Sequence, residues 1–121
     1  MLEFIDIDVE GVVAYRLDGK ISTEEMNRVL YVFRKTIAAG NKLNLYQEIT
    51  GLGGLEFEAL GEKLKFFLEF GLSDFGRVAV VADKKWIPRL IDLEGRLLKK
   101  IQLRGFSMDE KATALSFLKG E

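Results

Sequence analysis

The chain alternates between short segments with a two-residue hydrophobic period and longer segments with a helical period. Alternating or β-branched hydrophobic positions predict five strands, because successive side chains of a strand point to opposite faces of a sheet. These predicted strands span residues 2–7, 12–17, 42–49, 77–82 and 100–104. Hydrophobic residues spaced three and four apart predict four helices. The predicted helices span about residues 22–40, 56–70, 86–98 and 109–118.

The connections between these elements predict the topology of the sheet. Only a short turn joins the first two strands, which predicts an antiparallel hairpin with the first strand at the edge. Later strands are separated by helices, so right-handed crossovers and a mostly parallel sheet are expected. In the third strand, Leu43, Leu45 and Ile49 lie on one face, and the other face carries polar groups. We therefore predict a single α/β domain over residues 1–121, with a five-stranded sheet covered mainly on one face.

The first predicted helix has clear boundary signals. Ser22 and Glu25 match a capping box, in which each side chain accepts a hydrogen bond from the other residue's backbone amide. Gly40 follows the last hydrophobic position and can adopt the left-handed conformation that ends many helices. Asp109 and Glu110 likewise stand at the start of the last predicted helix, where we interpret them as capping charges.

Composition restricts the chemistry that the chain can perform. The 121 residues include no histidine and no cysteine. This excludes Ser-His-Asp and Cys-His relays, a thiolate nucleophile and an ordinary zinc site. The 18 basic residues are balanced by 19 acidic ones, so no general excess of positive charge favours nucleic-acid binding. We predict a non-enzymatic protein with no cofactor, no metal site and no nucleic-acid partner.

Hydropathy predicts a cytoplasmic location. No hydrophobic run approaches the roughly 18 residues that span a bilayer. The acidic, alternating N-terminus also lacks the basic and then apolar pattern of a secretory signal. Contact with a membrane would therefore be peripheral.

A glycine-rich turn at residues 50–54 joins the third strand to the second predicted helix. Glycines at such a junction can let a phosphate approach backbone amides and the positive end of the helix. The spacing matches neither GxGxxG nor a P-loop. Glu56 and Glu58 in the first turn would also repel an anion. A connecting loop is therefore favoured over an anion site.

The predicted helix at residues 56–70 carries two apolar faces. One is a conventional core stripe formed by Phe57, Leu60, Leu64, Phe67 and Leu68. The second lies roughly opposite and contains Leu55, Ala59, Phe66 and Phe70. A surface helix needs only one such face, so the second must be covered by the chain itself, another subunit, a ligand or a membrane. The sequence leaves these alternatives open.

The segment after the most hydrophobic strand, residues 83–87, lies at the carboxyl end of the predicted sheet, where open α/β sheets bind ligands. Lys84 and Lys85 stand beside Trp86 and Ile87 there. This composition is typical of an interfacial anchor, with the ring among lipid headgroups and the lysines on anionic lipid. Trp86 also lies on one helical stripe with three leucines, so burial of its ring in the core is the alternative.

The order of elements and four segments resemble the SpoIIAA-like family, which is related in fold to STAS domains, the class of bacterial anti-sigma-factor antagonists. The segments are LDGKISTEE (17–25), EITG (48–51), RVAVVADKKW (77–86) and ALSFL (114–118). The resemblance implies a β-α superhelix with the sheet covered largely on one side. That fold is shared with CRAL-TRIO lipid-binding domains, so the resemblance also implies an apolar ligand or membrane contact.

One feature of STAS regulators is missing. Their helix after the glycine turn opens with a motif whose serine is phosphorylated to break partner binding, whereas residues 56–58 here read Glu-Phe-Glu. The phosphorylation switch is therefore not carried over.

These observations predict a small homodimeric binding module that holds an apolar small molecule or touches a membrane surface. The predicted contact residues are Lys84, Lys85, Trp86, Ile87, Phe66 and Phe70. A STAS-type protein-interaction regulator without the phosphorylatable serine is the alternative.

Overall fold

The computed structural model of the chain describes residues 1–51, 59, 70–89, 91–92 and 101–121. Five strands lie in these residues: β1 (Leu2–Phe4), β2 (Val13–Asp18), β3 (Leu43–Thr50), β4 (Phe75–Ala82) and β5 (Gln102–Ser107). The helices that lie wholly within the described residues are α1 (Thr23–Ala38), η2 (Leu72–Asp74), η3 (Met108–Glu110) and α4 (Lys111–Lys119). The first and last predicted helices are therefore confirmed.

The other two predicted helices are only partly visible. Residues 87–89 and 91–92 are helical and belong to the predicted helix at 86–98. The predicted helix at 56–70 lies outside the described residues apart from Ala59 and Phe70, so Leu55 and Phe66 of its second apolar face are not described. The number of four helices therefore stays a prediction.

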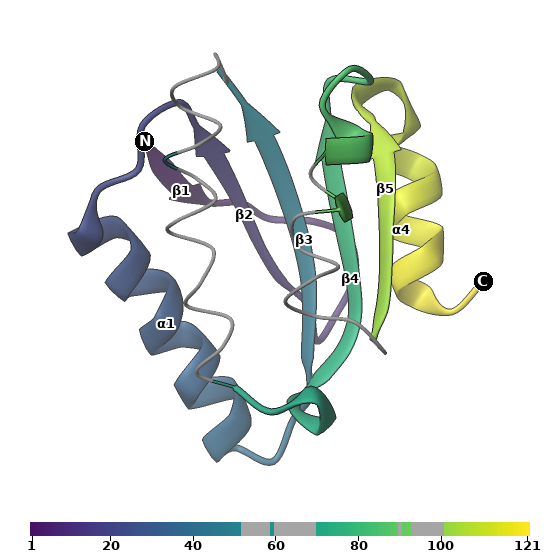
Figure 1. The fold of residues 1–121 in the computed structure, drawn as a ribbon. Coiled ribbons are helices and arrows are strands. Elements are labelled where there is room, and N and C mark those ends of the chain that lie inside the picture. The colour runs from purple at the N-terminus through teal and green to yellow at the C-terminus, as the bar shows by residue number, and fades with distance from the viewer. Residues whose placement is uncertain (52–58, 60–69, 90, 93–100) are drawn as a thin grey trace.

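The strands form one sheet in the order β1-β2-β3-β4-β5 (Figure 1). β1 pairs with β2 in antiparallel register, and the other three neighbouring pairs are parallel. This confirms the mostly parallel sheet with an antiparallel N-terminal edge strand. β1 is shorter than predicted, because the hydrophobic side chains that follow it pack on the α4 side of the sheet. These side chains are Ile5, Ile7, Val9 and Val12.

Helix α1 begins at the predicted capping box. The Ser22 hydroxyl accepts from the Glu25 amide at 3.1 Å, and Glu25 Oε1 accepts from the Ser22 amide at 3.0 Å. The other oxygen of Glu25 accepts from the Leu2 amide at 2.6 Å, which ties the edge strand to the helix. Hydrogen bonds from the Ser22 and Leu2 amides lower the pKa of Glu25 to about 2.

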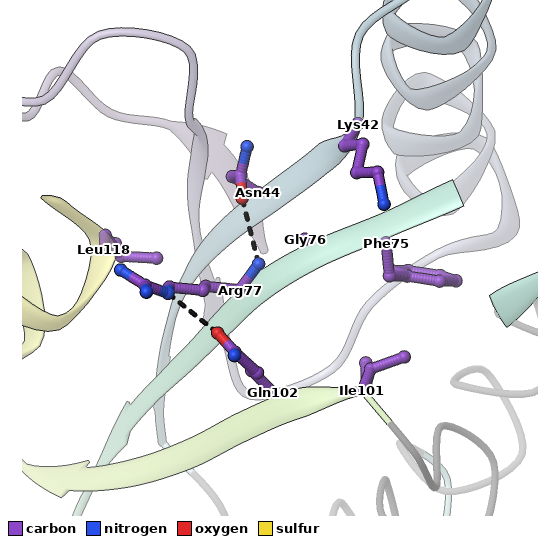
Figure 2. Close-up of a pocket in the computed structure, with 8 residues that line it drawn as sticks. All are labelled: Lys42, Asn44, Phe75, Gly76, Arg77, Ile101, Gln102 and Leu118. Atoms are coloured by element: carbon purple, nitrogen blue, oxygen red, sulfur yellow. Dashed lines mark hydrogen bonds between the residues drawn. The ribbon is translucent and has the colours of Figure 1, made fainter. Parts of the chain in front are cut away.

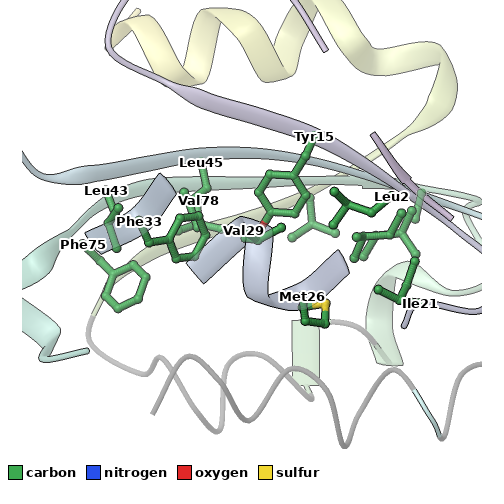
Figure 3. Close-up of a cluster of buried hydrophobic side chains, with 14 residues drawn as sticks. Leu2, Tyr15, Ile21, Met26, Val29, Phe33, Leu43, Leu45, Phe75 and Val78 are labelled. Atoms are coloured by element: carbon green, nitrogen blue, oxygen red, sulfur yellow. The ribbon is translucent and has the colours of Figure 1, made fainter. Parts of the chain in front are cut away.

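Helices α1 and α4 pack on opposite faces of the sheet (Figure 1). Alternate residues of β3 and β4 therefore enter two separate cores. The larger core, on the α1 face, is drawn in Figure 3 and contains Tyr15, Phe33, Leu43, Leu45, Ile49, Val78 and Val80 among others. The smaller core, on the α4 face, contains Ala14, Tyr46, Ala79, Val81, Phe106, Ala114 and Leu118.

The prediction of a sheet covered mainly on one face needs correction. The α1 face does carry the larger core, but α4 and the segment after β1 also cover the opposite face. The prediction took the polar positions of β3 as a sign of a poorly covered face, yet Tyr46 and Glu48 are only 2% and 3% exposed. Both can be buried because their polar groups are hydrogen-bonded inside the protein.

Candidate functional site

The turn that follows β4 is shaped by Asp83 at the carboxyl edge of the sheet. Its carboxylate accepts from the Lys85 amide at 3.1 Å, and its carbonyl accepts from the Trp86 amide at 2.9 Å. A side-chain oxygen that accepts from the amide two residues later is the usual way in which aspartate stabilises a turn. The turn presents residues 84–86 in succession and then leads into the helical residues 87–89.

The Trp86 ring packs against the hydrophobic core and is bordered by basic side chains. The ring is partly buried and packs against the α1-face core. The Lys85 ammonium lies 5.7 Å and the Arg89 guanidinium 5.5 Å from the ring centroid, within cation–π range. Lys84, Lys85 and Arg89 are all exposed. The ring is therefore held by core packing, and the cationic groups around it face solvent.

Ile87 contributes packing at the same turn. It is partly buried against the α1-face core, and it approaches the backbone of β5 closely. A Cβ placed on Gly105 would lie 2.6 Å from Cγ2 of Ile87, so only glycine fits beneath this side chain. Ile87 thereby fixes the distance between the turn and β5.

Phe70 joins the same core from the segment before η2. Its ring makes edge contacts with Phe33 and Phe75, at centroid distances of 5.8 and 6.4 Å. Phe70 and Trp86 both pack against the α1-face core, so the structure brings these two predicted site residues to one hydrophobic cluster. Phe66 lies outside the described residues.

A buried carboxylate network on the α4 face was not predicted as a site. Glu48 accepts from the Tyr46 hydroxyl at 2.7 Å and from Arg16 Nε at 2.8 Å, and it pairs with the Lys111 ammonium at 3.2 Å. Burial alone would raise the pKa of Glu48, but these three donors outweigh it and hold that pKa below its usual value. Burial and the neighbouring carboxylate raise the pKa of the Tyr46 hydroxyl.

This network is suited to holding elements together. It joins β2, β3 and α4, and Arg16 extends it to Glu3 on β1 at 2.5 Å. The side chain of Glu48 is 4% exposed and already has three donors, so a ligand has little access to it. The only sequence signal for it was the position of Glu48 on the polar face of its strand.

Polar groups also gather where β5 ends. The Ser107 amide donates to Glu110 Oε1 at 2.8 Å, and the Ser107 hydroxyl contacts both Asp109 and Glu110. These hydrogen bonds from Ser107 lower the pKa values of Asp109 and Glu110, and the positive charge of Lys84 adds a smaller effect. The prediction that the two acidic residues cap a helix start is confirmed.

A cleft of about 480 Å³ lies at the amino ends of the parallel strands, away from the edge that the sequence favoured. Figure 2 shows its lining: Lys42, Asn44, Phe75, Gly76, Arg77, Ile101, Gln102 and Leu118. Arg77 donates through Nε to Gln102 at 2.8 Å and through Nη1 to the Phe117 carbonyl at 2.9 Å. Because Phe117 is in the last turn of α4, Arg77 serves as a cap of that helix. The Arg77 guanidinium in this cleft thus has a structural role.

Two further properties concern only the described part of the chain. There, no helix is both long enough and apolar enough to cross a membrane. Within the same residues, no three or more acidic side chains are grouped so that they could hold a metal ion.

Comparisons with known proteins identify the family. Neither the curated proteins nor the solved structures gave a match to this chain. The family model described as SpoIIAA-like matches residues 12–119, which include every described element from β2 to α4. The five-stranded, mostly parallel sheet with one antiparallel pair is consistent with a STAS-type domain, a type that indicates a regulatory or interaction module. The chain belongs to the SpoIIAA-like family.

Proposed function

We propose that the protein is a non-enzymatic lipid-binding module that contacts a membrane surface, or an apolar ligand, through the turn after β4. The observation that carries this proposal is the position of Trp86. Its ring packs on the α1-face core, while Lys84, Lys85 and Arg89 beside it are exposed. An amphipathic ring bordered by cationic groups suits the region between lipid headgroups and acyl chains.

The electrostatics of the turn favour anionic lipid. A lysine close to an anionic membrane surface contributes about 1 kcal/mol of binding free energy. Part of the Lys84 charge is offset by Asp109 and Glu110, whose pKa values it lowers. The Lys85 ammonium lies over the Trp86 ring, and the Lys85 amide donates to the Asp83 carboxylate. We therefore expect both lysines to contribute to the electrostatic attraction.

Co-sedimentation with vesicles of phosphatidylglycerol or phosphatidylcholine tests the proposal. The wild type is expected to bind phosphatidylglycerol vesicles and to release them at high salt, because exposed charges are screened. Lys84→Gln/Lys85→Gln should weaken this binding up to about 30-fold, from about 1 kcal/mol for each lysine. The matched control is Lys42→Gln/Lys119→Gln, which removes two exposed lysines elsewhere and should bind as the wild type does.

Trp86→Ala separates the aromatic contribution from the charge. The variant keeps both lysines but loses the ring, so it should bind vesicles more weakly than the wild type while remaining salt-sensitive. Circular dichroism must first show that it folds, because the ring also packs on the core. Equal, negligible co-sedimentation of the wild type and all variants with both vesicle types would contradict membrane contact.

A protein-interaction regulator of STAS type is the second candidate function. The family match favours it, because that family indicates a regulatory or interaction module. Residues 56–58, which replace the phosphorylated motif of STAS regulators, lie outside the described residues. A homodimer is expected under both candidate functions, and sedimentation equilibrium tests whether it forms. A single monomeric mass at every protein concentration would contradict the dimer.

A further inference from the structure

Gln47 is a polar side chain in the middle of a hydrophobic surface. It lies on the central strand β3 and is 0% exposed. Its side-chain Nε2 donates to the Tyr15 hydroxyl at 2.6 Å. Its Oε1 is the one buried side-chain nitrogen or oxygen atom, among the residues that the structure describes, without a hydrogen-bond partner.

The surroundings of Gln47 are otherwise apolar. Leu43, Leu45 and Ile49 lie on the same face of β3 and belong to the α1-face core, part of which Figure 3 shows around Tyr15. In the sheet, Gln47 stands between Tyr15 on β2 and Val80 on β4. A buried carbonyl without a partner destabilises the folded protein, so methionine or leucine would fit this position better if packing were its only role.

An ordered water is a poor partner for this amide. Buried waters are held by two to four polar groups. Near Gln47, the described neighbours in the core offer hydrocarbon surface apart from the Tyr15 hydroxyl, which accepts from the amide. A molecule with a long apolar body and one small polar group fits these surroundings better, because the apolar body replaces the polar partners that a water would need.

A hydroxyl group is the best chemical match. As oriented, Gln47 presents a carbonyl that needs a donor. If the amide were rotated by half a turn, it would present an NH₂ group that needs an acceptor. A hydroxyl can donate and accept, so it suits both orientations. An ionised carboxylate can only accept and would also have to leave water for an apolar core. A plain alkane satisfies neither orientation.

We propose that Gln47 and Tyr15 are the polar anchor of a binding site for an uncharged amphiphile with one hydroxyl group, located on the α1 face of the sheet. This inference rests on the proposed lipid-binding function and adds the chemical class of the ligand. Gln47 recognises the hydroxyl. Tyr15 holds the amide in place through its own hydroxyl. The hydrocarbon part of the ligand packs against the core residues around them.

Binding of three probes of equal chain length tests the proposal. 1-Octanol, octane and octanoate are each added to the full chain, and affinity is obtained from the concentration dependence of the thermal unfolding midpoint. Native mass spectrometry gives the stoichiometry. The wild type is expected to bind 1-octanol about five- to tenfold more tightly than octane or octanoate, because octane cannot pair with the amide and octanoate would bring a charge into the apolar core.

Substitutions at Gln47 and Tyr15 test whether these residues cause the preference for 1-octanol. Gln47→Met keeps the length of the side chain without the amide, so the preference for 1-octanol over octane should disappear while octane still binds. This variant removes the unpaired carbonyl but also the hydrogen bond to Tyr15, so circular dichroism must first show that it folds. Tyr15→Phe should reduce the preference, because the amide loses the hydrogen bond that fixes its position and must be ordered when the alcohol binds. Gln102→Met, which replaces an exposed glutamine on β5, is the matched control and should keep the full preference.

The outcomes separate this inference from membrane contact. Equal affinity for all three probes, an unchanged preference in Gln47→Met, or no binding of any probe would each overturn the anchor. A crystal structure grown with 1-octanol that has only a water on Gln47 would also overturn it. If the probes fail while phosphatidylglycerol vesicles still bind, membrane contact stands without the anchor. If 1-octanol binds as expected while vesicles do not, the anchor stands and membrane contact fails.

Discussion

The Lys111 ammonium on α4 lies 3.2 Å from the Glu48 carboxylate on the central strand β3. Through this pair the last helix is attached to the strand whose other face carries Gln47. The same carboxylate accepts from Arg16 and Tyr46. The Glu48 carboxylate is therefore the common partner of groups on β2, β3 and α4. Loss of its charge should weaken the contacts among all three elements.

Glu48→Gln should lower the free energy of unfolding by about 1–3 kcal/mol, because it leaves buried donors with a weaker, neutral acceptor. Urea unfolding followed by circular dichroism measures the change. Glu3→Gln is the matched control, since it removes the partly exposed carboxylate on the same arginine and should cost less than about 1 kcal/mol. Equal changes in the free energy of unfolding for the two substitutions would contradict the claim that burial makes the Glu48 interactions stronger.

Acid should destabilise the protein through Glu25. Its folded pKa of about 2 lies below the value of about 4.5 for an unperturbed glutamate. The folded state therefore binds the proton more weakly than the unfolded state, and the resulting stabilisation is complete above the unfolded pKa. It is lost as the pH falls from about 5 to about 2. The depressed pKa of Glu48 acts in the same direction.

Urea unfolding of Glu25→Gln at several pH values measures that contribution. The variant should lose less stability than the wild type between pH 5 and pH 2, because its amide does not titrate. Glu24→Gln, at an exposed position on the same helical turn, serves as the control and should follow the wild-type curve. A wild-type slope in Glu25→Gln would contradict the role of the capping carboxylate.

Gly76 and Asn44 should show strong energetic coupling. Asn44 Oδ1 accepts from the Arg77 amide at 2.9 Å, and a Cβ on Gly76 would lie 2.0 Å from that same oxygen. Gly76→Ala should therefore destabilise the chain by about 1–3 kcal/mol through overpacking. In an Asn44→Ala background the same substitution should cost much less, and a double-mutant cycle measures the difference. Additive effects would contradict the close contact.

Local sequence signals predicted much of the fold. The Ser22 and Glu25 capping box is present as expected, because such motifs depend on contacts between residues only three apart. The antiparallel first pair and the mostly parallel remainder of the sheet followed from connection lengths, which limit how neighbouring strands can pair. These features need no information from distant parts of the chain.

Tertiary contacts account for what the sequence did not reveal. The polar side chains of Tyr46 and Glu48 suggested that this face of the sheet is not covered. Glu48 is buried there because its partners Arg16 and Lys111 come from other elements, which the sequence does not show. The pairing of Asn44 with Gly76 likewise depends on the register between two strands.

The candidate site shows the same division. Sequence composition identified the lysines beside Trp86, but not the Arg89 guanidinium over the same ring. The contact of Phe70 with Phe33 also required the folded chain, because the two residues are far apart in sequence. Gln47 gave no signal at all, since an unpaired amide can be recognised only when its surroundings are known.

Trp86 is the only tryptophan in the chain, so its fluorescence reports directly on the proposed membrane contact. The most direct test is a titration of the wild type with phosphatidylglycerol vesicles while the emission spectrum is recorded. We expect a saturable shift to shorter wavelength, reversed by salt and absent with phosphatidylcholine, because the ring moves from a partly wet position into the interface. An emission spectrum that stays unchanged at saturating phosphatidylglycerol would contradict the proposed function.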